Sequence, residues 1–262
     1  EAGYLGMAWP ARYGGGGRPQ ALQDVVTAEM ARQKVPFMTN TIGLNWAGPL
    51  ILAIGTEEEK QRYIRGILNA EDIWCQGFSE PDQGSDLANA QTRAVREGDS
   101  YVINGSKIWT SYAMDANHMF ILVRTDKNAK KQEGISFLLF RMDTPGIEIR
   151  PLVDMTMNHS FNEVFFENVR VPKDSIVGER GRGWYVSRST LKNERALIGN
   201  ATFARRTFDG LQMMAQLTEV RGAPVIKDPV FRDKLVELEG HLLAAEYNGH
   251  RLLTSGGRGE DP

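Results

Sequence analysis

The segment that decides the fold lies between residues 74 and 86 and reads Trp74-Cys75-Gln76-Gly77-Phe78-Ser79-Glu80-Pro81-Asp82-Gln83-Gly84-Ser85-Asp86. It opens as an apolar strand and continues into a loop of small and polar residues. Consecutive backbone N–H groups near Gly84 and Ser85 are suited to form an anion-binding concavity for a pyrophosphate. A Pro/Gly turn with an aspartate cap explains the same composition, so both interpretations stay open at this point.

The region around this segment, residues 73–177, shows the two-residue period of β-strands. Tyr101-Val102-Ile103 and Lys107-Ile108-Trp109 flank Asn104-Gly105, which predicts a hairpin with a type I′ turn. Further strands are predicted at residues 119–123, 135–140, 147–153 and 163–171, with polar turns between them. Short, regularly spaced strands favour a small antiparallel barrel or sandwich.

Helical periodicity is found on both sides of the strands. Residues 20–69 follow it, and Thr56 with Glu59 predicts a capping box. From Gly181 to about Leu253 it returns, with one break at Arg221-Gly222-Ala223-Pro224. The run Gly14–Gly17 lacks the spacing and the preceding strand of a dinucleotide fingerprint, so we predict a flexible turn there. The order of elements is helices, strands, helices, which argues against a doubly wound nucleotide-binding fold.

The composition of the chain argues against several classes of partner and of binding site. The net charge of −2 gives no reason to expect a nucleic-acid or anionic-membrane partner. A single cysteine, Cys75, allows no disulfide within the chain. The four histidines have no metal-ligand spacing, so we predict no metal site and place the histidines on the surface or in loops. No apolar run approaches the roughly 20 residues of a membrane span.

Four motifs together resemble those of the acyl-CoA dehydrogenase family, in the family's order and spacing. They are Trp9-Pro10-Ala11-Arg12-Tyr13-Gly14-Gly15; Glu80-Pro81-Asp82-Gln83-Gly84-Ser85-Asp86; Lys107-Ile108-Trp109-Thr110-Ser111; and Asn168-Val169-Arg170-Val171-Pro172 with Gly178 and Gly181-Arg182-Gly183-Trp184. The resemblance covers essentially the whole chain and implies an α+β fold. Residues 1–72 would form N-terminal helices, residues 73–178 a central antiparallel β-barrel or sandwich, and residues 179–262 the start of a C-terminal helical bundle. Both ends look cut, so we expect a truncated chain that is inactive as it stands and binds its cofactor weakly.

The cofactor that the resemblance implies is FAD. Phe78 and Ser79 would donate to the pyrimidine side of the ring, Trp109 would pack against the ring, and Ser111 would bond near its N5 edge. Ser85 would also approach the pantetheine of the substrate. The full set of implied cofactor residues is Gln76, Phe78, Ser79, Gly84, Ser85, Trp109, Thr110 and Ser111.

The reaction implied by the resemblance removes two hydrogens across the α,β bond of an acyl-CoA, giving the trans-2-enoyl-CoA. A carboxylate takes the α-proton, and the β-hydrogen leaves as hydride to the flavin. A minority of the family places this base directly before an arginine on the first long helix, where this chain has Glu194 and Arg195. Lys192 and Arg195 are the further substrate contacts implied. Glu194 could equally be a charged helix residue paired within its own turn, with the base elsewhere in the C-terminal part.

The resemblance also implies partners and rival functions. An electron-transfer flavoprotein would accept the electrons, and the protein would assemble as a homodimer, homotetramer or heterotetramer. It would be cytoplasmic in a bacterium and in the mitochondrial matrix in a eukaryote. Its rivals are a non-catalytic subunit of a heteromer, a flavin-dependent oxidase or hydroxylase, and a non-enzymatic scaffold. The family's R-K-x-F-G block is replaced by residues 219–226, which are more similar to the bacterial fatty-acid or steroid branch and leave Arg221 as a doubtful substitute.

Replacing Glu194 with Gln tests its assignment as the base. The amide keeps the shape of the side chain but cannot accept the α-proton, so the full-length protein should bind flavin normally while its reduction by acyl-CoA slows by several orders of magnitude. Stopped-flow absorbance measures this step directly. A rate within about tenfold of the parent, or about 1.4 kcal/mol, would exclude Glu194 as the base.

Overall fold

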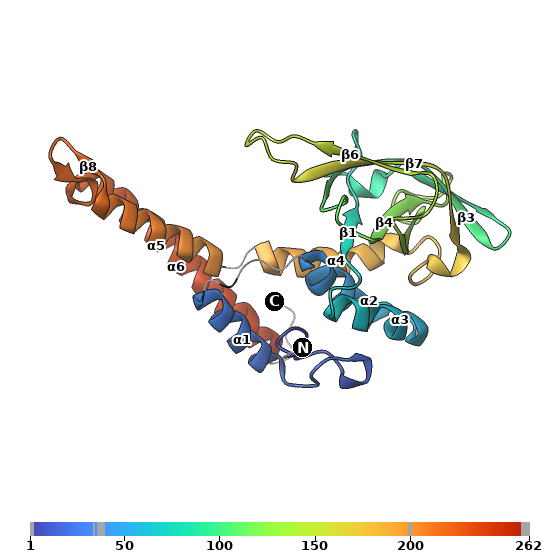
Figure 1. Ribbon diagram of the computed structural model, residues 1–262, viewed down its shortest axis with the longest axis horizontal. Coiled ribbons are helices and arrows are strands. Elements are labelled where there is room, and N and C mark those ends of the chain that lie inside the picture. Colours follow the sequence, from blue (N-terminus) through green and yellow to red (C-terminus); the bar gives the residue numbers. More distant parts are fainter. Residues whose placement is uncertain (1–2, 34, 36–39, 199–200, 258–262) are drawn as a thin grey trace. The chain divides into compact units, whose positions relative to one another are not determined.

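The computed structural model describes residues 3–33, 35, 40–198 and 201–257. The chain forms two compact units, Glu1–Asn193 and Glu194–Pro262, and each is described by itself. The first unit contains helices followed by a curled sheet, and the second contains long helices (Figure 1). The predicted order of helices, strands and helices is therefore confirmed. The predicted boundaries at residues 72 and 178 stay a prediction.

The N-terminal helices of the first unit are α1 (Gln20–Arg32), α2 (Gly48–Ile54) and α3 (Glu57–Leu68), and a π-helical turn, Gly43–Ala47, leads into α2. The predicted capping box is confirmed. The Glu59 backbone N–H donates to the Thr56 hydroxyl at 3.2 Å, and the Thr56 N–H donates to the Glu59 carboxylate at 2.7 Å. These bonds satisfy two backbone donors that the first turn of α3 would otherwise leave unpaired.

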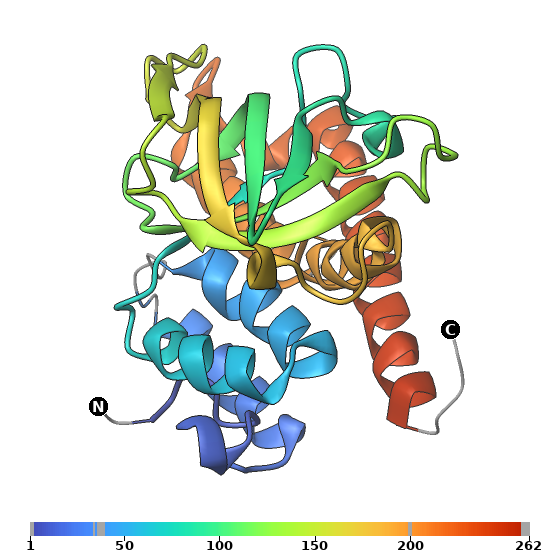
Figure 2. The same cartoon turned by 90° about the vertical axis from the view of Figure 1, so that its right-hand side faces the viewer.

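The central sheet has the strand order β1-β4-β2-β3-β7-β6, with β5 paired to β4 (Figure 2). Its strands are β1 (Trp74–Gly77), β2 (Arg93–Glu97), β3 (Ser100–Ser111), β4 (His118–Arg124), β5 (Ile135–Arg141), β6 (Ile147–Leu152) and β7 (Phe161–Pro172). The four strands predicted after residue 118 are confirmed. The sheet is mixed rather than wholly antiparallel, because β1 and β2 both pair with β4 in parallel. The crossover that brings β1 beside β4 is a long-range pairing, which strand periodicity does not encode.

The predicted turn at Asn104-Gly105 is wrong. Both residues lie inside β3, where the register with β7 shifts between Ile103 and Gly105. Asn104 alone faces Glu167 and Asn168 there, so the extra residue of this bulge lies on β7. Gly105 has a φ of +143°, and its backbone lies so close to Thr92 that a Cβ would be 2.8 Å from that residue's Cα. The β2–β3 turn instead uses Gly98 and Asp99, with Gly98 at φ +59°. Gly98 and Gly105 both have positive φ, and local sequence alone did not distinguish a glycine inside a strand, opposite a bulge, from a glycine in a turn.

The sheet is covered on both faces at β4. Phe120 and Leu122 pack with the helices through Ile64 and their neighbours, whereas Met119 and Ile121 pack on the opposite side with residues of β3 and β7. Successive side chains of a strand point to opposite faces, so a strand buried on both faces is apolar throughout. Residues 119–123 are therefore a continuous apolar run.

The glycine run packs tightly against the chain before it. The Gly15, Gly16 and Gly17 N–H groups donate to the carbonyls of Pro10, Gly6 and Trp9 respectively. A Cβ on Gly15 would lie 2.3 Å from the Trp9 carbonyl oxygen. The run is a turn, as predicted, but close backbone packing rather than flexibility is the reason for glycine.

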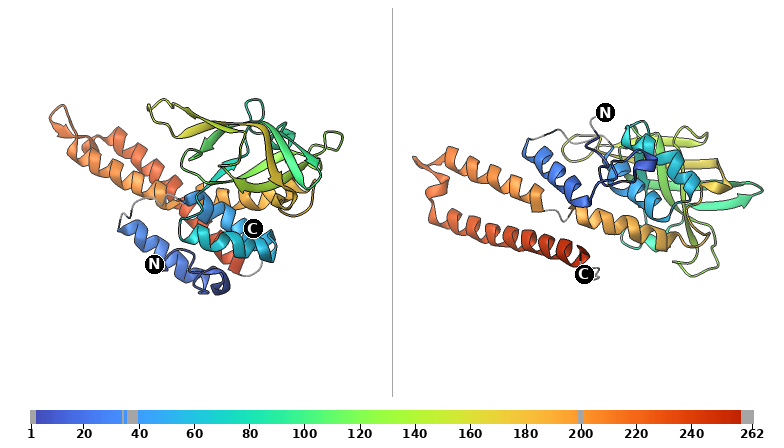
Figure 3. Two further views of the ribbon diagram at one scale, coloured as in Figure 1. Left: turned by 45° about the vertical axis from the view of Figure 1, so that its right-hand side comes forward. Right: turned by 90° about the horizontal axis from the view of Figure 1, so that it is seen from below.

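The helices that follow the sheet are α4 (Gly183–Ile198), α5 (Ala201–Leu217) and α6 (Pro229–Gly257). Within the second unit α5 and α6 lie side by side (Figure 3) and bury Phe208, Leu235 and Leu242 between them. The predicted break is confirmed as the turn between β8 (Glu219–Val220) and β9 (Ala223–Pro224). No helix in the described part of the chain is both long and apolar enough to cross a bilayer.

The loop between β6 and β7 is organised by one carboxylate. Asp154 accepts hydrogen bonds from the Thr156 backbone N–H at 2.8 Å, the Asn158 N–H at 3.2 Å and the Ser160 hydroxyl at 2.9 Å. The Thr156 and Ser160 side-chain bonds, followed by the backbone bonds, lower the pKa of Asp154 to about 2 from its ordinary 3.8. An aspartate whose pKa is lowered in the folded protein contributes its full stability at pH values above its ordinary pKa. That contribution decreases as the pH falls below 3.8 and through about 2.

Replacing Asp154 with Ala should loosen this loop without unfolding the sheet. At pH 6 the Thr156 and Asn158 amides should exchange with solvent faster by about tenfold or more, because each loses a charged acceptor. Amide hydrogen exchange measures this, and protection in the parent should be unchanged between pH 6 and pH 4. Asp126→Ala is the control, since Asp126 accepts the Asn128 N–H in a separate loop. Unchanged exchange at Thr156 in the Asp154 variant would contradict the assignment.

Candidate functional site

The two segments that the sequence assigned to a cofactor lie next to each other. The Ile108 N–H of β3 donates to the Ser79 carbonyl at 2.9 Å, directly after β1 ends at Gly77. The Glu80–Gln83 turn then closes with reciprocal backbone bonds of 2.9 and 3.0 Å. The loop of small residues is therefore fixed against the middle of β3.

A buried ion pair joins the loop to the strand. Lys107 Nζ lies 2.8 Å from Glu80 Oε1, and the side chains are 0% and 6% exposed. Glu80 also accepts the Gln91 N–H at 2.6 Å and the Thr92 N–H at 2.9 Å. Lys107 Nζ donates a second bond, to the Phe78 carbonyl at 3.1 Å. Burying charges is costly unless each is paired and hydrogen-bonded, and here both are.

The protonation of this pair follows from burial and pairing. Burial lowers the pKa of the Lys107 ammonium from 10.5 to about 8, with a smaller contribution in the same direction from Arg124 on β4 and an opposing effect of Glu80. Burial alone would raise the pKa of Glu80. Lys107 and the two backbone donors outweigh that effect, so the pKa of Glu80 lies below its ordinary value. The pair is therefore ionised at neutral pH.

Trp109 lies at a second irregularity of β3. Its φ is +58°, a left-handed value that is unusual for a large residue, and the register with β7 shifts between Lys107 and Thr110. Trp109 is 60% exposed, and its ring lies edge-to-face with that of Phe161, with ring centroids 5.9 Å apart. A bulge of this kind re-aims a side chain, and here it presents an indole to the outside of the sheet.

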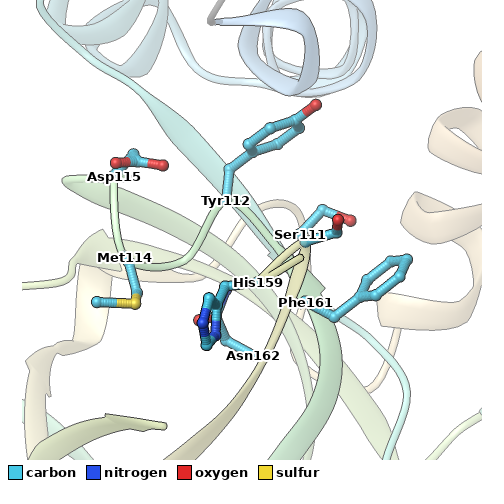
Figure 4. Close-up of a pocket in the computed structure, with 8 residues that line it drawn as sticks. Ser111, Tyr112, Met114, Asp115, His159, Phe161 and Asn162 are labelled. Carbon is cyan, nitrogen blue, oxygen red and sulfur yellow. The ribbon is translucent and has the colours of Figure 1, made fainter. Parts of the chain in front are cut away.

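A pocket of about 320 Å³ lies beyond Trp109, where β3 ends and β7 begins (Figure 4). Tyr112 at its edge is also left-handed, with a φ of +59°, and its carbonyl accepts the N–H groups of Asp115 and Ala116. The residues that line the pocket are Ser111, Tyr112, Met114, Asp115, His159, Ser160, Phe161 and Asn162. Ser111 is the member of this set that the sequence assigned to the cofactor.

The other predicted cofactor residues differ in which of their atoms a ligand could reach. Gly84 and Ser85 are exposed, and Ser79 is half-buried. The Phe78 ring is buried against Phe120 and Phe137, so only its backbone can face a ligand. The side-chain oxygens of Gln76 and Thr110 are buried and have no hydrogen-bond partner within the described part of the chain. The loop, Trp109 and Ser111 therefore carry the accessible contacts.

Three predicted residues lie outside what the structure describes. Lys192, Glu194 and Arg195 fall within the range of α4, but the side chains from residue 192 to residue 203 are outside the described residues. Their assignments as substrate contacts and as the base stay predictions.

Sequence reasoning missed Lys107 and Glu80 as partners, although both stand in the motifs it quoted. The available signal was that Lys107 is the one charged residue among residues 100–111, and a lysine that is buried in a strand requires a buried acceptor. It also placed every histidine on the surface or in loops, and this is wrong for His118. His118 begins β4, is buried and stacks on Trp74 at 5.0 Å. Burial, then the nearby Arg141 and Arg62, lower the pKa of His118 to about 4, so it is neutral near pH 7.

Comparison with known families covers nearly the whole chain. The N-terminal, middle and C-terminal domain models of acyl-CoA dehydrogenases match residues 1–71, 75–169 and 181–260. The chain belongs to the acyl-CoA dehydrogenase family. The motifs that predicted this family include the loop and the strand that form the candidate site.

Individual acyl-CoA dehydrogenases are similar over most of this chain. Acyl-CoA dehydrogenase IpdE1 of Mycobacterium tuberculosis is 38% identical over 88% of the chain and 60% of its own length. Human mitochondrial short-chain specific acyl-CoA dehydrogenase is 33% identical over 96% and 61%. The solved structure of a Tcur3481-Tcur3483 steroid ACAD variant gives a TM-score of 0.87 at 32% identity, covering 99% of this chain and 67% of that one. The chain therefore spans about 60% of the length of these two curated relatives.

Replacing Lys107 with Ala should strongly destabilise the protein. It leaves Glu80 as a buried, uncompensated charge, which costs about 3–5 kcal/mol. The free energy of unfolding from urea denaturation checks this. Lys131→Ala is the matched control, because Lys131 pairs with Asp86 at 2.6 Å but both side chains are about half exposed, and it should cost at most about 1 kcal/mol. The double variant Lys107→Met/Glu80→Gln should recover part of the loss, because it removes the uncompensated charge but leaves the Phe78 carbonyl without its donor. Equal losses at Lys107 and Lys131 would contradict the assignment.

Proposed function

We propose that the whole protein binds FAD and dehydrogenates an acyl-CoA thioester to the trans-2-enoyl-CoA. The observation that carries the proposal is Trp109, an exposed indole in a left-handed bulge beside a fixed loop. Strained backbone in a large residue persists only where the surrounding structure enforces it, and it concentrates at ligand sites. Membership in the acyl-CoA dehydrogenase family supports the same assignment.

The residues present fit a flavin. Within the described residues the Ser79 N–H has no hydrogen-bond acceptor, so it is free to donate to a ligand. Trp109 would cover one face of the ring, and Ser111 would donate at its N5 edge. Gly84 and Ser85 are exposed and would contact the pyrophosphate and the pantetheine. Bound FAD would supply the two-electron acceptor that the side chains of this chain lack.

The remaining chemistry belongs to the protein. The proposed base, Glu194, would remove the α-proton, with Arg195 and Lys192 binding the thioester side of the substrate. The fixed donors at Phe78 and Ser79 would stabilise negative charge on the pyrimidine side of the ring without reorganising during the reaction. An electron-transfer flavoprotein is the electron acceptor we propose, in the cytoplasm of a bacterium or the mitochondrial matrix of a eukaryote.

Assembly with a second, related chain is a further candidate. The name of the solved steroid relative joins two designations, Tcur3481 and Tcur3483, which favours a heteromer over a homomer for a protein similar to it. A purified homomer that turns over acyl-CoA would exclude the partner-only role.

Flavin identity and substrate bleaching test the proposal together. The full-length protein should purify yellow, release FAD rather than FMN on heating, and lose its visible flavin absorbance when mixed anaerobically with an acyl-CoA. Chromatography of the released flavin and absorbance spectra provide these readouts. FMN, or no flavin after reconstitution, would refute the cofactor, and rapid oxygen uptake during turnover would favour an oxidase.

Trp109→Gly should weaken flavin binding selectively. Glycine adopts the left-handed backbone of this bulge without strain, so the fold should be retained while the ring loses its stacking surface. The Kd for FAD should rise by about tenfold or more. Fluorescence titration of the apoprotein measures it, with Tyr112→Gly as a control for a left-handed residue at the pocket edge. An unchanged Kd in the Trp109 variant would remove the observation that carries the proposal.

A further inference from the structure

The Lys107 ammonium makes a contact that the ion pair with Glu80 does not explain. Besides bonding the carboxylate at 2.8 Å, Nζ donates to the Phe78 carbonyl oxygen at 3.1 Å. Both partners are buried with it. Phe78 O therefore accepts a charge-assisted hydrogen bond inside the protein, where such bonds are short and strong.

The other end of the same peptide group points away from Lys107. Phe78 C=O and Ser79 N–H belong to one planar unit, and no cis peptide bond is found among the described residues. In a trans peptide the C=O and N–H vectors are opposed. A carbonyl directed at Lys107 therefore directs the Ser79 N–H away from it, and within the described chain that N–H meets no acceptor.

Hydrogen bonds in series polarise one another, most strongly where the dielectric constant is low. A cation on the carbonyl oxygen draws electron density through the amide toward oxygen. The N–H of that amide becomes a stronger donor. The Ile108 N–H bond to the Ser79 carbonyl, 2.9 Å long, fixes the next peptide group and keeps this one from rotating.

We propose that Lys107 raises the reduction potential of the flavin by polarising the Phe78–Ser79 peptide group. The inference rests on the proposed function, in which the Ser79 N–H donates to the pyrimidine side of the ring. Negative charge collects on that side when the flavin is reduced, so a stronger donor binds the reduced form more tightly than the oxidised form. Lys107 acts through a backbone amide and is therefore a positioning residue.

The charges around Lys107 allow two effects on the reduction potential to be separated: that of the hydrogen bond to Phe78 O and that of the net charge. Glu80 faces it from the loop and neutralises it, and Arg124 faces it from β4. The double substitution Lys107→Met/Glu80→Gln removes one positive and one negative charge, so the net charge is unchanged. A change in potential then reports the lost bond to Phe78 O.

The experiment uses the full-length, FAD-loaded protein. Slow reduction against a reference dye of known potential gives the ratio of affinities for reduced and oxidised FAD. In Lys107→Met/Glu80→Gln this ratio should fall by about tenfold, which for a two-electron couple lowers the potential by about 30 mV. The flavin carbonyl Raman band should shift in the direction of weaker hydrogen bonding. The control is Lys131→Met/Asp86→Asn, which removes an exposed pair of the same kind at 2.6 Å and should change the ratio by less than about twofold.

A second measurement needs no variant. Since the pKa of Lys107 lies at about 8 and would rise when the flavin is reduced, reduction should take up an additional proton above that pH. The parent's potential should therefore fall more steeply with pH above about 8. A loaded double variant with the parent's potential, or a parent slope with no break near pH 8, would overturn the inference while leaving the flavin assignment intact. A parent protein that binds no flavin would instead refute the proposed function itself.

Discussion

The buried ion pair between Lys107 and Glu80 is the constraint on which the candidate site depends. It joins three parts of the sequence: the loop after β1, the strand β3 and, through the Gln91 and Thr92 N–H groups, the two residues directly before β2. Each bond is directional, and together they fix the backbone of the loop rather than merely burying it. Hydrophobic packing is non-directional and could not specify which way the Phe78–Ser79 peptide faces.

The irregular positions of β3 are arranged around that fixed point. Positive φ values occur at Gly105, Trp109 and Tyr112. These residues interrupt the regular extended backbone in the second half of β3 and directly after its end. Regular pairing would place alternate residues on each face, whereas at the shift of register between Lys107 and Thr110 both of these residues are buried and Trp109 between them is exposed. The strain of the left-handed residues is tolerated because buried neighbours on either side determine the backbone. The strand thereby presents an aromatic ring outside while anchoring a cation inside.

How much of this the sequence could predict depended on the range of the interactions. Local patterns predicted the capping box at Thr56, the strands after residue 118 and the break before Pro224 correctly, because each depends on neighbouring residues. The Asn104-Gly105 turn failed for the same reason. Gly105 has positive φ but Asn104 does not, and pairing with β7 keeps both inside the strand, opposite a bulge in β7. The parallel pairing of β1 with β4 and the burial of His118 likewise arise from contacts far apart in sequence. Among the site residues, the motifs located the loop and Trp109, but only three-dimensional contacts revealed what Lys107 bonds.

Stability alone does not account for an ion pair at this position. A buried pair can often be replaced by apolar side chains of similar volume with little loss, since the cost of removing two charges from water offsets their attraction. Such a replacement here would leave the Phe78 carbonyl without its donor, and a buried carbonyl without a partner is itself costly. The carbonyl must face inward if the Ser79 N–H is to face outward, because the peptide plane ties the two together. A cation inside the sheet is therefore the counterpart of a free N–H outside it. Glu80 is required because that cation is buried.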